Sequence, residues 1–187
     1  MKYKDFKFTG HKKLEAYCLQ AMTYKIMLSG RYEADTYICS PLRADTRKEV
    51  DMNMSAARAY LTYANLKMGF SAIAPHAFLP LILDDNEQEE RDCAFKIGLL
   101  ILKKCQRILV CGRTISAGMI GEITNAFILG KEVLVFNRGV YDAIKEMAEQ
   151  NGYNTEKLIY DKSHSYLSAS AKEIIPHDDE EGEGDVM

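Results

Sequence analysis

From residue 35 onward the chain alternates between short β-prone runs and longer stretches with helical spacing. The short runs predict four strands, over residues 36–39, 70–74, 107–111 and 132–136. Elsewhere apolar residues recur every three to four positions. They predict four helices, over residues 48–67, from the acidic stretch 84–90 to about 104, 118–129 and 141–150.

Alternating strands and helices of this length indicate an α/β fold. The run Arg107–Cys111 is apolar on both faces, as expected of a central strand in a parallel sheet. Right-handed connections then give a single-domain, Rossmann-like (flavodoxin-like) doubly wound parallel sheet. Such sheets bind ligands at the carboxyl ends of their strands, near the point where the strand order changes direction. The segments that follow the predicted strands are residues 40–45, 75–86, 112–122 and 137–141.

Three regions of the chain differ in pattern. Residues 1–34 predict an N-terminal helical appendage, with apolar residues near helical spacing over 14–26, which packs on the core or on a partner chain. Residues 35–160 predict the α/β domain. Residues 161–187 form a C-terminal extension, and we expect its acidic end from Pro176 to be disordered because it has too few apolar groups to pack.

Composition narrows the class of function. At 187 residues and 47% hydrophobic, the chain can bury one substantial core. Its net charge of −3 predicts no basic face, so we expect no nucleic acid polymer as a partner. No apolar run is long enough to span a bilayer, and the charged start lacks a signal-peptide core. We therefore expect no membrane partner and a cytoplasmic location.

The cysteines and glycines do not form known cofactor motifs. The five cysteines show no CxxC spacing, so we expect no metal and mostly buried, free thiols of a reducing compartment. Cys111 ends a strand, but no histidine is predicted beside it, and we interpret it as a packing residue. Neither GxGxxG nor GxxxxGK[ST] occurs, so dinucleotide and P-loop sites lack their defining residues.

The segment between the third predicted strand and the next helix carries the strongest candidate site. It runs from Gly112 to Glu122 and includes Ser116 and Gly118. Small residues before a helix let a ligand approach the backbone, and the free N–H groups attract anions. Glu122 lies about one turn further, so its side chain can point back towards them. A ligand with a phosphate for the turn and a sugar for Glu122 fits this pattern. An ordinary turn with a surface glutamate is the alternative.

Two further segments place polar side chains at the same edge. Ser40 and Arg43 suit a phosphate or carboxylate clamp, although a loop arginine is usually only solvated. His76 is either a pocket base or a capping group, with the second slightly favoured. The acidic residues 84–92 suit a helix start for dipole reasons alone, and one or two of them could still face a pocket. Tyr37 is more readily a core aromatic than a pocket hydroxyl.

Five short motifs occur in order along the chain: Tyr37-Ile-Cys-Ser-Pro41, Pro75-His76, Glu90-Arg91-Asp92, Ser116-x-Gly118-x-x-x-Glu122 and Gly130-Lys131. This order resembles the nucleoside 2-deoxyribosyltransferase-like superfamily. The closest resemblance is to an uncharacterised (DUF4406-like) branch of small, often phage- or mobile-element-encoded domains, related to the 2′-deoxynucleoside 5′-phosphate N-hydrolases. It covers about residues 35–137, and its most specific part runs from Ser116 to Lys131.

The resemblance implies catalysis by two carboxylates and no cofactor. Enzymes of this superfamily transfer or hydrolyse the N-glycosidic bond of deoxynucleosides or nucleoside 5′-phosphates. By position, Glu122 matches the nucleophile that attacks the anomeric carbon. The assisting carboxylate best matches Asp92, and Asp85 is the rival because the helix that follows is longer in this chain.

The resemblance also implies where a 5′-phosphate binds. Ser116 and Gly118 match the turn that holds it in the hydrolases, and Arg43 falls where they place an arginine. Two positions depart from the pattern of the superfamily. Met119 stands where transferases carry threonine, and Cys105-Gln106 replaces an Ala-Asp pair. These changes bear on substrate identity more than on fold.

We therefore expect an enzyme that cleaves or exchanges the base of a (deoxy)nucleoside or nucleoside 5′-phosphate through a carboxylate nucleophile. The alternative is non-catalytic binding, sensing or sequestration of a nucleotide-derived, ADP-ribose-type small molecule. The resemblance also implies a homodimer or higher homo-oligomer. The expected substrate-binding residues are Tyr37, Ser40, Arg43, His76, Gly112, Ser116, Gly118 and Met119.

Overall fold

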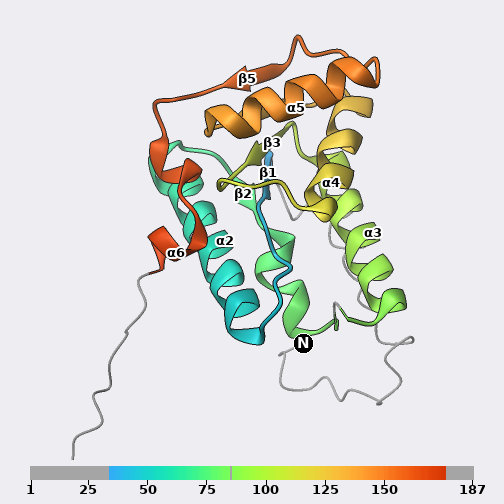
Figure 1. The fold of residues 1–187 in the computed structure, drawn as a ribbon, viewed down its shortest axis with the longest axis vertical. Coiled ribbons are helices and arrows are strands. Elements are labelled where there is room, and N and C mark those ends of the chain that lie inside the picture. The colour runs from blue at the N-terminus through green and yellow to red at the C-terminus, as the bar shows by residue number, and fades with distance from the viewer. Residues whose placement is uncertain (1–33, 85, 176–187) are drawn as a thin grey trace, which may run out of the picture.

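The computed structural model describes residues 34–84 and 86–175, which form one parallel sheet with helices on both faces (Figure 1). Neighbouring strands are hydrogen-bonded in the order β2-β1-β3-β4-β5, and every neighbouring pair is parallel. The strands are β1 (Thr36–Cys39), β2 (Ala72–Ile73), β3 (Arg107–Val110), β4 (Glu132–Val135) and β5 (Leu158–Tyr160). The α/β, flavodoxin-like fold predicted from the sequence is confirmed.

Helices connect the strands and cover the sheet. The α-helices are α2 (Arg47–Lys67), α3 (Gln88–Lys104), α4 (Ala117–Ile128), α5 (Arg138–Gln150) and the short α6 (Ala171–Ile174). Single 3₁₀ turns form η2 (Pro75–Ala77), η3 (Leu79–Leu81) and η4 (Ser165–Ser168). Of the helices that the structure describes, none is both long and apolar enough to cross a membrane.

The alternation of side chains along the strands divides the core into two layers. Ile38, Leu109 and Leu134 pack on the face covered by α2. Ile108 and Val133 pack on the opposite face, against α3, α4 and α5. Both faces of the central strands are therefore buried, which explains why these strands read as continuous apolar runs.

The four predicted strands and four predicted helices are present, with small shifts at their ends. Helix α5 begins at Arg138, earlier than predicted, because the Asn137 side chain caps it by accepting the Val140 N–H at 3.2 Å. Strand β5 was not predicted from the sequence. The predicted N-terminal helix over 14–26 and the acidic end from Pro176 lie outside the described residues.

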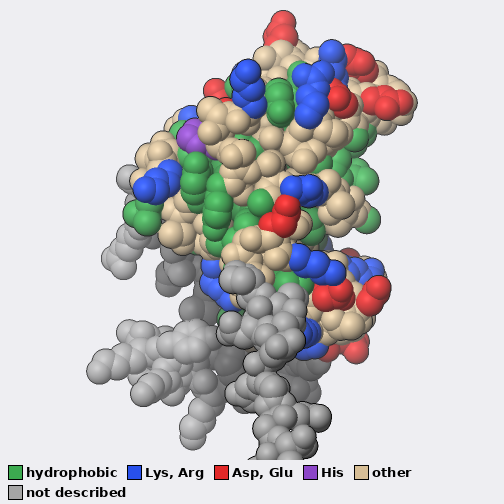
Figure 2. All heavy atoms as spheres, turned by 60° about the vertical axis from the view of Figure 1, so that its left-hand side comes forward, with side chains coloured by type: hydrophobic (Ala, Val, Ile, Leu, Met, Phe, Trp, Pro, Cys, Tyr) green, Lys and Arg blue, Asp and Glu red, His purple; other side chains and the backbone are tan. Residues whose placement is uncertain are grey.

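The segment that follows β5 packs back onto the α2 face of the sheet. Leu167 is fully buried there, and its carbonyl accepts the Gly112 N–H at 2.9 Å. The Tyr60 hydroxyl of α2 donates to the Ala169 carbonyl at 2.6 Å. Figure 2, which turns the left-hand side of Figure 1 forward, shows hydrophobic side chains among the charged groups at the surface. Leu66 of α2 is one of the exposed apolar residues of the chain.

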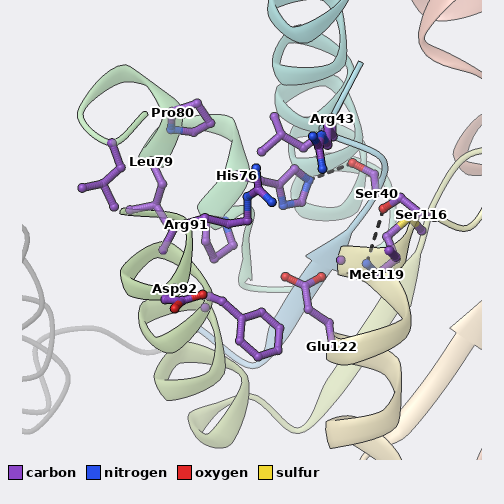
Figure 3. A pocket seen from close by; sticks show the side chains of 18 of the residues that line it. Ser40, Arg43, His76, Leu79, Pro80, Arg91, Asp92, Ser116, Met119 and Glu122 are labelled. Atoms are coloured by element: carbon purple, nitrogen blue, oxygen red, sulfur yellow. Dashed lines mark hydrogen bonds between the residues drawn. The ribbon is translucent and has the colours of Figure 1, made fainter. Parts of the chain in front are cut away.

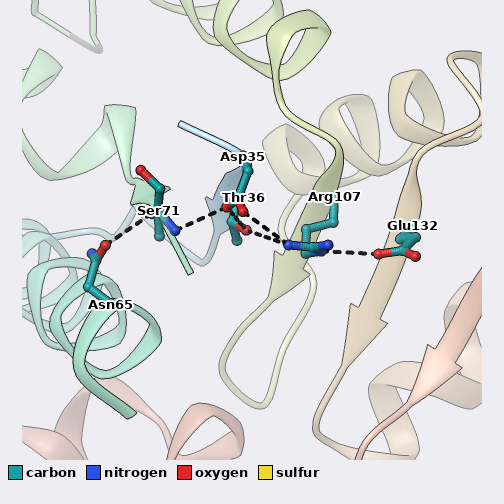
Figure 4. A network of polar contacts seen from close by, with 7 residues as sticks. Asp35, Thr36, Asn65, Ser71, Arg107 and Glu132 are labelled. Carbon is teal, nitrogen blue, oxygen red and sulfur yellow. Dashed lines mark hydrogen bonds and ion pairs between the residues drawn. The ribbon is translucent and has the colours of Figure 1, made fainter. Parts of the chain in front are cut away.

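A polar network joins four strands at the amino-terminal edge of the sheet (Figure 4). Arg107 at the start of β3 pairs with Glu132 of β4 at 3.0 Å and with Asp35, just before β1, at 3.4 Å. Its guanidinium also lies over the Phe70 ring, 4.5 Å from the centroid. Asp35 in turn accepts the Ser71 N–H beside β2 at 3.1 Å. The network ties together the starts of these strands, at the edge of the sheet opposite the carboxyl ends of the strands.

Replacing Arg107 by alanine should lower the free energy of unfolding by about 1–2 kcal/mol, because two carboxylates lose a partly buried partner and Phe70 loses its cover. Urea unfolding followed by circular dichroism measures this. Arg47→Ala is the matched control, since Arg47 pairs with Asp51 at 3.0 Å while both side chains are more than half exposed. Equal effects of the two substitutions would show that the Arg107 network has no special weight.

Candidate functional site

A cavity of about 330 Å³ opens at the carboxyl ends of β1 and β3. Strand β2 lies on one side of β1 and β3 on the other, so the strand order changes direction here. Open α/β sheets bind ligands at this switch point. The walls come from the β1–α2 loop, the η2–η3 segment, α3 and the first turn of α4 (Figure 3). The cavity therefore occupies the place that the fold class predicts.

Glu122 of α4 projects into this cavity and is held from the strand side (Figure 3). The Tyr37 hydroxyl of β1 donates a hydrogen bond of 2.6 Å to Glu122 Oε1. Burial raises the pKa of Glu122, while the hydrogen bonds from Tyr37 and from the Cys39 thiol act in the opposite direction. Burial, followed by the charge of Glu122, also raises the pKa of Tyr37 well above its ordinary value, so the phenol keeps its proton and donates it.

The first turn of α4 forms the next part of the wall. Ser116 caps the helix, and its hydroxyl accepts the Met119 N–H at 3.4 Å. The Ser116 N–H in turn points to the Met119 sulfur at 3.5 Å, so methionine completes a capping box that usually needs a carboxylate or amide. Ala117 and Gly118 are exposed in this turn and line the cavity. The first N–H groups of a helix lack intrahelical acceptors, so this turn can receive an anion.

Ser40 and His76 form a buried pair in another part of the cavity wall. Ser40 follows β1, His76 lies in η2, and Ser40 Oγ is 2.8 Å from His76 Nε2. Burial lowers the pKa of His76 to about 4. The imidazole is therefore neutral at neutral pH. One of its ring nitrogens donates a hydrogen bond and the other accepts one.

Three charged residues at the start of α3 line the cavity beside the exposed Arg43. Glu90 is buried and accepts the Asp84 N–H at 2.7 Å, which fixes the loop before the helix. Asp92 is exposed and accepts a hydrogen bond of 2.7 Å from Gln88. Figure 3 shows Asp92 and Glu122 on opposite walls, with Arg91 beside Asp92 on α3. The cavity thus combines two arginines with carboxylates from two helices.

The structure brings together nearly all of the residues predicted from the sequence. The residues that line the cavity as predicted are Tyr37, Ser40, Arg43, His76, Asp92, Ser116, Gly118, Met119 and Glu122. Asp85, the rival to Asp92, lies outside the described residues.

Gly112 was expected among the substrate-binding residues, but it does not line the cavity. Its φ of +92° marks it as a turn residue, and a methyl group there would lie 3.3 Å from the Pro41 ring. Of the strand-to-helix segment 112–122, the residues that line the cavity begin at Ser116.

Sequence reasoning missed several wall residues. They are Leu79, Pro80 and Leu83 in and after η3, and Phe95 and Gly98 of α3. The η3 segment has neither helical nor strand periodicity, so its apolar residues gave no signal. Gly98, in contrast, did carry a signal. An isolated glycine inside a helical pattern lowers helix stability and therefore needs a structural reason.

Nothing in the described part of the chain gathers three or more metal-binding side chains into one site. The four cysteines that are described there are buried and form no disulfide. Burial raises the pKa of Cys111, which fits a packing residue rather than a nucleophile.

A family model described as "Domain of unknown function (DUF7768)" matches residues 34–136, which is 103 of the 187 residues. The chain belongs to this family. The match covers β1 to β4 and every described residue of the cavity. Searches of curated proteins and of solved structures found no match.

The neutral state of His76 makes stability depend on pH. Its native pKa of about 4 lies below the ordinary value of 6.5, so the unfolded chain binds a proton first as the pH falls. This contribution to stability is complete above pH 6.5 and is lost between pH 6.5 and 4, at about 1.4 kcal/mol per unit. From pH 7 to 5, the wild type should lose about 2 kcal/mol more than His76→Gln in urea unfolding.

Glu122 contributes with the opposite sign, because its native pKa is raised, but it is present in both proteins and cancels in this difference. Equal losses of stability in the two proteins would mean that the pKa of His76 in the native state is not lowered, so that the folded protein takes up this proton as readily as the unfolded chain.

Proposed function

We propose that this member of the DUF7768 family cleaves or exchanges the base of a (deoxy)nucleoside or nucleoside 5′-phosphate, with Glu122 as the nucleophile. The observation that carries the proposal is a carboxylate held in a cavity by a tyrosine hydroxyl, about one helical turn from a helix start that lines the same cavity. The resemblance to the nucleoside 2-deoxyribosyltransferase-like superfamily supports the same assignment.

The hydrogen bond from Tyr37 selects which oxygen of Glu122 reacts. Because the phenol occupies Oε1, the second carboxylate oxygen is the one available for attack. In the first step this oxygen bonds to the anomeric carbon, the N-glycosidic bond breaks, and the base leaves with the electron pair. The leaving base takes up a proton from solvent water, and Asp92, on the facing wall, assists by orienting that water. Water or another base then attacks the same carbon and gives up its proton to solvent, and the glycosyl–Glu122 bond breaks to release Glu122 as a carboxylate.

The two ends of the substrate need different surroundings. A 5′-phosphate would meet the N–H groups of Ala117 and Gly118, the Ser116 hydroxyl and the Arg43 guanidinium. The base would lie against the apolar wall of η3 and α3, which includes Leu79 and Phe95. The sugar, which carries no charge, would then lie over Glu122. This order separates the phosphate from the carboxylate and avoids the repulsion of two anions.

Binding without turnover is the second candidate, and one observation favours it. Burial raises the pKa of Glu122, which disfavours the ionised carboxylate that an attack on carbon requires. In a binding protein the cavity would hold a nucleotide-derived ligand, such as an ADP-ribose-type molecule, with Glu122 hydrogen-bonded to the sugar. Calorimetry followed by chromatography distinguishes the two, because a bound ligand recovered intact supports binding alone.

Glu122→Gln should reduce base release by a factor on the order of 10³ or more, since the amide cannot form the glycosyl bond. The measurement is chromatographic detection of free base from a panel of nucleosides and nucleoside 5′-monophosphates. Glu149→Gln on α5 is the control, because Glu149 is exposed and pairs with Lys145 at 3.8 Å on the surface. Unchanged activity in Glu122→Gln, with activity in the wild type, would exclude Glu122 as the nucleophile.

Arg43→Ala should raise KM for a nucleoside 5′-monophosphate roughly 10- to 100-fold and leave KM for the parent nucleoside nearly unchanged. The reason is the loss of one charge-assisted hydrogen bond to phosphate. Steady-state kinetics on the matched pair of substrates measures this difference. A similar change for both substrates would place Arg43 away from the phosphate.

A further inference from the structure

Gly98 lies on α3 directly behind the Tyr37–Glu122 hydrogen bond, and it lines the cavity. A methyl group at this position would lie 2.9 Å from the Tyr37 hydroxyl oxygen and 3.7 Å from Glu122 Oε1. Ordinary van der Waals contact begins at about 3.4 Å, so the first of these distances requires a displacement. The missing side chain at Gly98 is what gives the hydroxyl its place.

Tyr37 cannot move aside without changing its hydrogen bond to Glu122. Its side chain is 1% exposed and packs in the core layer between the sheet and α3. Its hydroxyl also makes the 2.6 Å hydrogen bond to Glu122. A shift of the hydroxyl away from α3 therefore changes that bond, and a shift of α3 disturbs the buried residues Ile97 and Ile101.

The backbone of Gly98 gives no other reason for glycine. It lies inside an α-helix without a positive φ, where glycine is less favourable than alanine. Gly121 on α4 is different, because a methyl group there would meet only the end of the half-exposed Phe95 ring, at 3.0 Å. Close approach of the Tyr37 hydroxyl is the specific feature of Gly98.

We propose that Gly98 is a positioning residue for Glu122, acting through Tyr37. By leaving room for the phenol, Gly98 sets where the hydroxyl holds Oε1 and therefore where the second oxygen of Glu122 faces the cavity. The catalytic meaning of this position rests on the proposed function, whereas the packing relation can be tested without substrate.

A double-mutant cycle on the ligand-free protein tests the packing relation. In the wild-type background, Gly98→Ala should lower Tm by about 2–4 °C, although the same change in an unconstrained helix raises stability. In the Tyr37→Phe background, which lacks the hydroxyl, Gly98→Ala should leave Tm unchanged or raise it. Gly139→Ala on α5 is the control and should not lower Tm, because its nearest contact is at 3.4 Å.

The pKa of Glu122, measured by carboxyl NMR titration, gives the readout that a merely structural role would not move. Gly98→Ala and Tyr37→Phe should both shift it upward, because each removes a hydrogen bond that favours the carboxylate. Their combination should shift it no further than Tyr37→Phe alone. If base release is observed, Gly98→Ala should reduce kcat roughly tenfold with little change in KM, corresponding to one pair of groups out of position.

Additive effects on Tm, or an unchanged pKa of Glu122 in Gly98→Ala, would overturn the proposal whether or not the protein is an enzyme. A wild type that releases no base, combined with coupled Tm and pKa effects, would overturn the proposed function and leave the positioning role of Gly98 supported. The two proposals therefore fail on different measurements.

Discussion

The hydrogen bond between the Tyr37 hydroxyl and Glu122 joins β1, an inner strand of the sheet, to the helix that carries the candidate site. Its direction is fixed, because burial keeps the phenol protonated and leaves the carboxylate as acceptor. Without this donor, a carboxylate facing the cavity would have lost much of its solvation with less in return. This one contact depends on the position of β1, on the length of the Tyr37 side chain and on the close approach of α3.

The two edges of the sheet have different tasks. At the amino-terminal edge, Arg107 links Asp35 and Glu132 in a polar network. At the carboxyl edge lie three of the four polar residues that are buried within the described part of the chain, namely Ser40, His76 and Glu90. Buried polar groups reduce stability unless they are paired, and here Ser40 pairs with His76 while Glu90 accepts the Asp84 N–H. The network at the other edge ties together the starts of β1 and β3, whose carboxyl ends lie at this cavity.

Much of this arrangement could be predicted from the sequence. Periodicity identified four strands and four helices, and the switch-point rule then located the residues that follow β1, β2 and β3 at one edge. Strand β5 escaped because its three residues are too short for a period to register, and only pairing with β4 defines it.

The closeness of packing between elements, and the burial that follows from it, could not be predicted. Sequence spacing shows which strand ends meet, but it does not show how closely α3 approaches β1, so the role of Gly98 and the burial of Glu90 were not visible. The place of Gly112 outside the cavity lining was not visible either, since a small residue at a strand end fits both a ligand turn and a tight turn against Pro41.

The burial of Glu122 bears on the choice between catalysis and binding. A ligand with a phosphate is already negative. A protein that only binds it therefore gains little from Glu122, a poorly solvated carboxylate that adds a second negative group to the same cavity. In the proposed reaction, however, positive charge develops at the anomeric carbon as the base leaves. A carboxylate that burial has made less stable in the empty cavity is then stabilised most in the transition state, where the opposite charge lies beside it. The raised pKa, which first counts against a nucleophile, is the ground-state side of that difference.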